Sequence, residues 1–204
     1  MSLKVVDGGE SIALQYLVNK GTPEDLKLCL YTDNHTPADP DVVGGYTEAA
    51  GFGYAEITLT GATWSVEAAY DFTDLVIDGA LNTKVTSASH NFVASDVGRM
   101  LRVDSGTGFT AGTYRIVSVA LNAATLDRAV GTAGSTGGSF HVPTTIVYAA
   151  QTFTFTGALG NVYGYFLKRA TGGELVLAEL FSDGPYNIQN NGDTITVTPQ
   201  ISAD

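Results

Sequence analysis

The stretch Gln151-Thr152-Phe153-Thr154-Phe155-Thr156 alternates polar and aromatic side chains, and this alternation decides the class of fold. Successive side chains of a β-strand point to opposite faces, so a period of two predicts a strand with one buried face. The stretch Asp193–Thr198 repeats the pattern and ends at Pro199. We therefore expect both segments to be half-buried strands.

Further strands are expected on either side of these two. Segments with alternating or continuous apolar residues occur at Leu26–Leu30, Glu56–Thr60, Val162–Leu167 and Leu175–Phe181. Turn-forming residues separate them at Gly172-Gly173, Ser182–Pro185 and Asn190–Asp193. No segment carries a 3.6-residue apolar stripe over three turns, so we expect at most single helical turns, near Pro23–Asp25 and Ala94–Val97. Many short strands at close spacing predict an all-β protein, either a sandwich or a barrel.

The middle of the chain has a different charge balance from its two ends. Residues Ile77–Pro143 contain four acidic and five basic residues, net +1, whereas the remainder of the chain is net −12. This asymmetry suggests separate units. We predict a jelly-roll-like β-sandwich host domain of residues 1–76 plus 144–204, with a small β-domain of residues 77–143 inserted in one loop. The host strands interrupted by it would be Tyr70–Thr73 and Thr144–Tyr148, and one continuous sandwich of about 200 residues is the alternative. The strands expected within the insert are Lys84–Thr86, Met100–Val103, Thr113–Val119, Ala124–Leu126 and Ser139–Val142.

Composition and charge exclude several classes of protein. Hydrophobic residues make up 44% of the chain and charged residues 15%, which is typical of a folded domain and not of a disordered or coiled-coil chain. The net charge of −11 argues against binding to nucleic acid or to an anionic membrane by charge. Cys29 is the only cysteine, so no intrachain disulfide is expected. The first ten residues lack the apolar run of a signal peptide, and no apolar run of membrane-spanning length occurs, so we expect synthesis and folding in a cytoplasm.

Catalytic motifs are not evident. The three histidines have no metal-ligand spacing, and no Gly-x-Ser-x-Gly elbow follows a strand. The glycine-rich stretch Gly106–Thr113 lacks the lysine and the following helix of a phosphate-binding loop. We therefore expect no catalytic residues, no cofactor and no enzymatic activity.

One polar loop is a weak candidate for a metal site. Asp33, Asp39 and Asp41 lie close together in sequence and carry the oxygen ligands that Ca²⁺ prefers. Their spacing is not that of an EF-hand, and Pro37 and Pro40 stiffen the loop. An exposed turn without a metal is the alternative interpretation.

Several segments of the predicted host domain resemble small structural proteins of tailed bacteriophages. The segments are Leu30–Pro37, Gly45–Ala49 with Gly53–Ala55, Ala62–Val66, Phe153–Gly157, Val162–Phe166 and Asn191–Pro199. The predicted insert resembles small β-modules of phage surface and tail proteins, through Phe92–Arg99 and Gly112–Ile116.

This resemblance implies a non-enzymatic virion protein made in the bacterial cytoplasm. It implies a capsid-decorating or cement protein that binds the major capsid protein or other virion proteins, with many weak contacts adding avidity on the lattice. Some self-association is expected, with a trimer as the suggested number. A host edge or the N-terminal arm, residues 1–11 with Leu3, Val5 and Val6, would contact capsid subunits, and the insert would project.

Two other functions are weighed against this one. A tail, neck or fibre component would bind an anionic glycan of the bacterial surface through Arg99, Arg102, Arg115 and Arg128 of the insert. An enzyme such as a depolymerase would need paired carboxylates along a groove, and no pairing of acidic residues is evident in the sequence.

Overall fold

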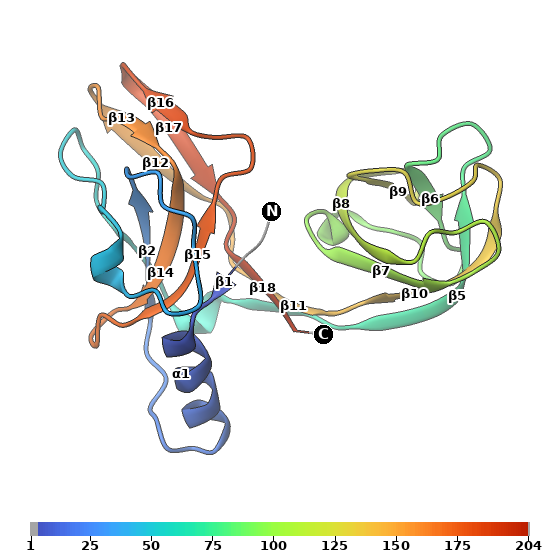
Figure 1. Ribbon diagram of the computed structural model, residues 1–204, viewed down its shortest axis with the longest axis horizontal. Coiled ribbons are helices and arrows are strands. Elements are labelled where there is room, and N and C mark those ends of the chain that lie inside the picture. Colours follow the sequence, from blue (N-terminus) through green and yellow to red (C-terminus); the bar gives the residue numbers. More distant parts are fainter. Residues whose placement is uncertain (1–3, 204) are drawn as a thin grey trace. The chain divides into compact units, whose positions relative to one another are not determined.

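A computed structural model describes residues 4–203, which fold mainly as β-strands (Figure 1). The all-β class expected from the alternating segments is confirmed. The chain divides into two compact units: unit 1 is residues 1–64 with 148–199, and unit 2 is residues 65–147 with 200–204.

Unit 1 contains a five-stranded antiparallel sheet in the order β1-β15-β14-β2-β3, and two strand pairs, β12–β17 and β13–β16. A single α-helix, α1 (Asp7–Leu17), follows β1. The strands of unit 1 are β1 (Lys4–Val5), β2 (Leu26–Tyr31), β3 (Ile57–Leu59), β12 (Gln151–Thr156), β13 (Gly160–Val162), β14 (Gly164–Arg169), β15 (Leu175–Leu180), β16 (Tyr186–Ile188) and β17 (Asn191–Val197). Its short 3₁₀ helices are Val43–Gly45 and Gly61–Thr63.

Strand β2 lies inside the five-stranded sheet, and both of its faces are covered. It pairs with β14 from Leu26 to Tyr31 and with β3 from Leu26 to Leu28. The segment Leu28–Tyr31 is fully buried, which explains its continuous apolar character. Tyr31 lies opposite Gly164, where a Cβ atom would come within 2.4 Å of the Tyr31 hydroxyl oxygen. A glycine is needed there because the tyrosine ring occupies the space of a side chain.

The pair β12–β17 has the one-sided burial that the alternating sequence predicts. Phe153 lies opposite Ile195, and both side chains are buried together with Phe155 and Val197. The intervening threonines are exposed, and the hydroxyl oxygens of Thr152 and Thr196 are 2.9 Å apart across the pair. The period of two thus separates a core face from a polar face.

Unit 2 contains a closed six-stranded barrel in the order β10-β5-β6-β9-β8-β7, and a three-stranded sheet in the order β18-β11-β4. Its short 3₁₀ helix is Ala94–Asp96. The barrel strands are β5 (Tyr70–Ile77), β6 (Lys84–Thr86), β7 (Met100–Ser105), β8 (Gly112–Ala120), β9 (Ala123–Leu126) and β10 (Thr136–Val142). The three-stranded sheet contains β4 (Ser65–Glu67), β11 (Thr144–Val147) and β18 (Gln200–Ala203).

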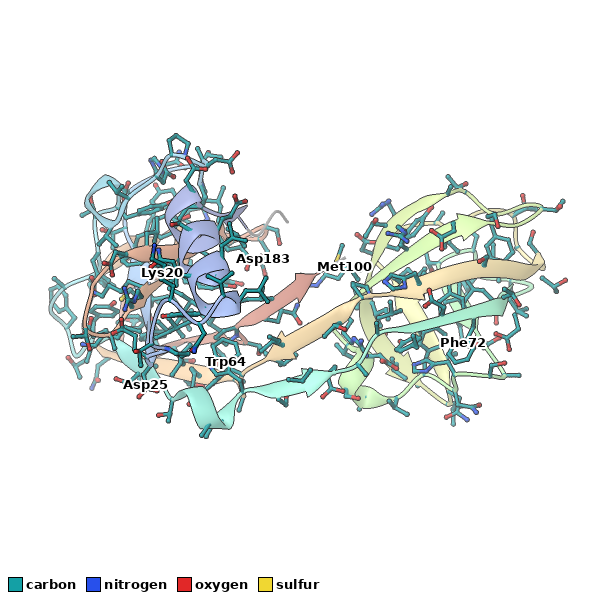
Figure 2. All side chains as sticks on the ribbon, turned by 90° about the horizontal axis from the view of Figure 1, so that it is seen from below. Lys20, Asp25, Trp64, Phe72, Met100 and Asp183 are labelled. Carbon is teal, nitrogen blue, oxygen red and sulfur yellow. The ribbon has the colours of Figure 1, made fainter. Side chains whose placement is uncertain are left out.

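The barrel has its own hydrophobic core. Alternate residues of its strands point inward, and Phe72, labelled in Figure 2, packs against them together with Tyr70. Closure leaves no unpaired edge in the barrel, because β10 pairs with both β5 and β7. The buried cluster consists of Leu75, Ile77, Val85, Phe92, Leu101, Val103, Tyr114, Ile116, Ala124, Leu126, Val130, Phe140 and Val142.

The unit boundaries differ from those suggested by composition. The expected borders at residues 76/77 and 143/144 fall inside or beside strands, because Tyr70–Ile77 is one barrel strand and Thr144–Val147 also belongs to unit 2. With these different boundaries, the difference in net charge between the two units is smaller than the expected +1 against −12. Unit 1 has thirteen acidic and five basic residues, net −8, and unit 2 has eight and five, net −3.

Helix α1 corrects the expectation of at most single helical turns, because Asp7–Leu17 forms an α-helix of 11 residues, whereas Pro23–Asp25 is not helical. Gly9 is the only fully buried residue of the helix, whereas Leu14 and Leu17 are exposed, so the apolar side chains of α1 do not mark a face buried against its own unit. A Cβ atom at Gly9 would lie 2.0 Å from the carbonyl oxygen of Val176, so the glycine allows the helix backbone to contact β15. A helix held in this way gives little periodic signal in its sequence.

We predict that residues 65–147 fold as an isolated chain, because the barrel core lies within Tyr70–Val142 and the two end residues pair with each other. The expected result is a β-type circular dichroism spectrum and one cooperative thermal transition. Residues 77–143 are the matched control. They lack Tyr70–Val76 of β5, so they should not close the barrel and should show no cooperative transition. Equal behaviour of the two fragments would contradict this account.

Candidate functional site

The densest group of reactive side chains in unit 1 surrounds Cys29 on β2. The sulfur Sγ of Cys29 lies 3.9 Å from Oε2 of Glu56, and the ligand atoms of Cys29, Glu48 and Glu56 lie within 4.8 Å of one another. Among residues 4–203 this is the one group of three or more His, Cys, Asp or Glu side chains with that spacing. We call Cys29, Glu48, Glu56 and Lys168 the Cys29 cluster.

The carboxylates of the Cys29 cluster form ion pairs with lysine side chains and a hydrogen bond with a tyrosine hydroxyl. The Nζ of Lys168 lies 3.0 Å from Oε2 of Glu48 and 3.0 Å from Oε2 of Glu56, and Lys27 pairs with the other oxygen of Glu56. The Tyr54 hydroxyl donates to Glu48 over 3.0 Å and accepts a hydrogen bond from the Leu30 N–H over 3.1 Å. The pair with Lys27 lowers the pKa of Glu56 against the effect of desolvation, and Lys168 adds to this. Both carboxylates of the Cys29 cluster are therefore paired with ammonium groups: Glu48 with Lys168, and Glu56 with Lys168 and Lys27.

Cys29 is held as a thiol in this environment. The residue is fully buried, and burial, followed by the negative charge of Glu48, raises its pKa to about 12. Only the thiolate is a nucleophile. Cys29 is thus not an activated nucleophile of the kind found in cysteine-dependent catalytic sites.

We predict that Cys29 in the folded protein resists alkylation. At pH 8 a pKa of about 12 leaves a thiolate fraction about a thousandfold smaller than that of a free cysteine, and restricted access of the reagent to the buried sulfur slows the reaction further. The rate of modification by iodoacetamide should rise about tenfold per pH unit while the fold persists, and should become ordinary in denaturant. Mass spectrometry of the alkylated chain measures both. Rapid native modification at pH 8 would show that the thiol is accessible and ionised.

A second polar cluster lies in the barrel around Asp96, which is 1% exposed. Its carboxylate accepts hydrogen bonds from the Tyr70 hydroxyl over 3.0 Å and from the Val93 N–H over 2.9 Å. The Nε2 of His90 lies 2.8 Å from the same carboxylate, and the His90 and Tyr70 rings stack with centroids 3.7 Å apart. Arg99 completes the cluster with Nη1 at 3.3 Å.

Arg99 is a structural residue and not part of an exposed interface. It is 3% exposed, and its Nη2 donates to the carbonyl oxygens of Ala68 over 2.7 Å and Pro143 over 3.0 Å. These bonds join the segments that enter and leave the barrel. The expectation that Arg99 faces a glycan is therefore corrected, because a buried guanidinium that bridges two backbone segments is not available to a ligand.

The other three predicted arginines lie on the barrel surface next to acidic partners or carbonyl oxygens. Arg102 pairs with Asp104 over 2.8 Å, and Arg128 pairs with Asp127 over 3.0 Å while its guanidinium lies 4.4 Å from the Tyr114 ring centroid. Arg115 is partly buried, and its N–H donates to Asp127. The barrel arginines thus do not form one unpaired cationic patch.

We predict that Arg99→Ala lowers the free energy of unfolding of the barrel by about 3–5 kcal/mol, because it leaves the buried Asp96 carboxylate without its guanidinium. Arg102→Ala is the matched control and should change it by no more than about 0.5 kcal/mol, because that ion pair is exposed. Urea unfolding of both variants measures the difference. Similar losses in the two variants would contradict the structural role of Arg99.

The predicted calcium ligands Asp33 and Asp41 use their carboxylates as hydrogen-bond acceptors for other parts of the protein. The Asp41 carboxylate accepts from the Ala38 N–H over 2.8 Å and from the Tyr46 hydroxyl over 2.7 Å, and it lies 2.8 Å from the Nε2 of His35. Although burial opposes it, these bonds hold the pKa of Asp41 below its usual value. Asp33 accepts from the Thr47 N–H over 2.6 Å, and the Asp39 carbonyl oxygen accepts from the Asp7 N–H over 2.9 Å. Within residues 4–203 the three aspartates do not form a common ligand group.

A cavity of about 500 Å³ lies in unit 1 beside the first turn of α1. Its walls are formed by Asp7 and Gly8, the loop 40–44 and the turn 172–175. The charged lining residues, Asp7, Asp41 and Glu174, are all acidic, which disfavours anionic ligands.

The exposed apolar surface of α1 is the main candidate interaction surface. Leu14, Leu17 and Val18 are 63%, 81% and 67% exposed, and their spacing of three and four residues places them on one side of the helix. We call these three residues the α1 ridge. Figure 1 shows α1 extending away from the strands of unit 1.

The residues expected to contact capsid subunits from the N-terminal arm do not form an exposed apolar surface where the structure describes them. Val6 is fully buried in the core of unit 1, and Lys4–Val5 pairs with β15 as strand β1. Leu3 lies outside the described residues. The Val6 side chain is therefore unavailable to a partner, and the α1 ridge presents the apolar surface that sequence reasoning placed in the arm.

The chain has no match among protein-family models, curated proteins or solved structures. Within the part of the chain that the structure describes, no helix is both long and apolar enough to cross a membrane.

Proposed function

We propose that the chain is a non-enzymatic structural protein of a tailed-bacteriophage virion, and that it decorates or cements the capsid by binding the major capsid protein. Support comes from the all-β fold, the resemblance noted in the sequence and the structural use of the reactive side chains. The Cys29 thiol is protonated, and the Asp96 cluster joins backbone segments. The first cluster therefore lacks an activated nucleophile, and the second has a structural role that needs no substrate.

The α1 ridge is the observation that carries the proposal. An isolated helix of about this length is marginal in water, so α1 needs tertiary contacts, yet Gly9 is its only fully buried residue, with Ile12 and Tyr16 partly buried. The three side chains of the α1 ridge, on Leu14 and Leu17 of the helix and on Val18 at its C-terminal end, remain in solvent. A partner subunit that covers the α1 ridge would supply the missing burial, and many copies on one lattice would multiply a modest contact.

The finer architecture is part of the same proposal. We propose that unit 1 is a jelly-roll-like sandwich that attaches to the particle, and that the barrel is a domain inserted in its sequence. Unit 1 is formed by residues 1–64 and 148–199, and all the barrel strands lie between these two stretches, which supports this view. Self-association, with a trimer as the first expectation, would place several α1 ridges on neighbouring lattice sites.

The alternative function, glycan binding by the barrel in a tail, neck or fibre, is supported less. It required a cationic surface, whereas Arg99 is buried and unit 2 is net −3. A unit of negative net charge does not attract an anionic glycan at long range.

We predict that a triple variant, Leu14→Gln, Leu17→Gln and Val18→Gln, binds particles that lack this protein at least about tenfold more weakly than the unaltered chain. Burial of one leucine contributes about 1.5–3 kcal/mol, so loss of three apolar contacts exceeds this threshold. The thermal unfolding temperature should stay the same, because the three side chains are exposed. Co-sedimentation with the particles measures the apparent Kd.

Leu121→Gln is the matched control, since Leu121 is 99% exposed at the β8–β9 turn and outside α1. It should bind like the unaltered chain. Unchanged binding of the triple variant would remove α1 from the attachment surface, and equal losses in both variants would point to general surface hydrophobicity.

A further inference from the structure

The Cys29 cluster is assembled by backbone pairing before any ligand is considered. Cys29 lies on β2, and Glu48 lies next to Tyr31 of the same strand through an isolated antiparallel bridge. Glu56 immediately precedes β3, whose residues pair with Leu26–Leu28 of β2. Two carboxylates are thereby fixed beside a buried thiol, so little ordering would be needed to bring the three groups to one ion.

The ligand types and their spacing suit a borderline-soft divalent cation. Zinc bonds to sulfur at about 2.3 Å and to carboxylate oxygen at about 2.0–2.2 Å, so two ligands of one tetrahedral zinc lie about 3.5 Å apart. The observed separation of 3.9 Å between Sγ of Cys29 and Oε2 of Glu56 is close to that value. A thiolate with two carboxylates leaves a fourth position for water.

A cation already occupies the space between the two carboxylates. The Lys168 ammonium lies 3.0 Å from Glu48 and 3.0 Å from Glu56, and its side chain is 17% exposed. The hydrogen-bond distances of the Cys29 sulfur are long, 3.9 Å to the Glu56 oxygen and 4.0 Å to the Lys27 carbonyl oxygen. The sulfur is therefore buried beside a cation position without a short hydrogen bond of its own.

We propose that Cys29, Glu48 and Glu56 form a binding site for Zn²⁺, and that Zn²⁺ enters by exchange with the ammonium group of Lys168. The metal forms bonds to the sulfur and to one oxygen of each carboxylate. The thiol proton passes to solvent, and the Lys168 head group moves outward. Lys168 is thus a competing internal cation that weakens the site, and hard ions such as Ca²⁺ are disfavoured by the thiolate ligand.

Co²⁺ is the spectroscopic probe for this site. A cobalt–thiolate bond produces a charge-transfer absorption in the near ultraviolet, and Cys29 is the only cysteine of the chain, so this absorption reports on Cys29 alone. Titration of the full chain with Co²⁺ should produce the band, and added Zn²⁺ should remove it. Cys29→Ser should abolish it.

Lys168→Met tests the exchange directly. Removal of the competing ammonium should increase the apparent Co²⁺ affinity at least tenfold, whereas an unrelated metal contact would not respond. Glu174→Gln, an exposed carboxylate outside the cluster, is the matched control and should leave the titration unchanged. Circular dichroism verifies that each variant is folded.

Three outcomes would overturn the proposal. These are the absence of a charge-transfer band in both the unaltered chain and Lys168→Met, cobalt binding without the band, and an affinity that is unchanged or lower in Lys168→Met. The proposal does not depend on the function in the virion, because the titration uses the chain alone.

Discussion

The pairing of β2 is the constraint on which unit 1 depends. This strand bonds to β14 along its whole length and to β3 over its first half, and its residues Leu28–Tyr31 are buried on both faces. One-residue slippage would exchange Cys29 and Tyr31 with Leu28 and Leu30 between the two faces. The register therefore positions both the core and the Cys29 cluster, and Gly164 enforces it by leaving room for the Tyr31 ring.

The barrel depends on two other constraints: its strands must close around one core, and the chain segments at its two ends must be held in place. Closure satisfies every barrel edge, and the Asp96 cluster fixes the ends through bonds from Arg99 to Ala68 and Pro143. A buried arginine is tolerated at this place because a carboxylate and several carbonyl oxygens compensate its desolvation. The buried charges of Asp96 and Arg99 thus stabilise the fold of unit 2.

Sequence reasoning predicted most of the strands, since a period of two at Gln151–Thr156 directly reflects one-sided burial. It did not predict α1, because the first turn of this helix contains two glycines and the closest packing against its unit is made by Gly9 and not by an apolar side chain. It placed Arg99 on a surface because sequence reports charge and not burial. The Cys29 cluster was also missed, since Glu48 and Lys168 are 120 residues apart and meet only through strand pairing. The one signal available in the sequence was that Lys27 and Cys29, two residues apart in a predicted strand, lie on the same face of it.

Electron microscopy of the parent particle, with a label fused to the C-terminus of this chain, shows directly where the protein lies on the virion. Capsid decoration predicts label distributed over the whole head in a regular lattice, because a decorating protein repeats with the major capsid protein. Label confined to the tail or neck would contradict capsid decoration. Its absence from purified particles would contradict a structural role in the virion.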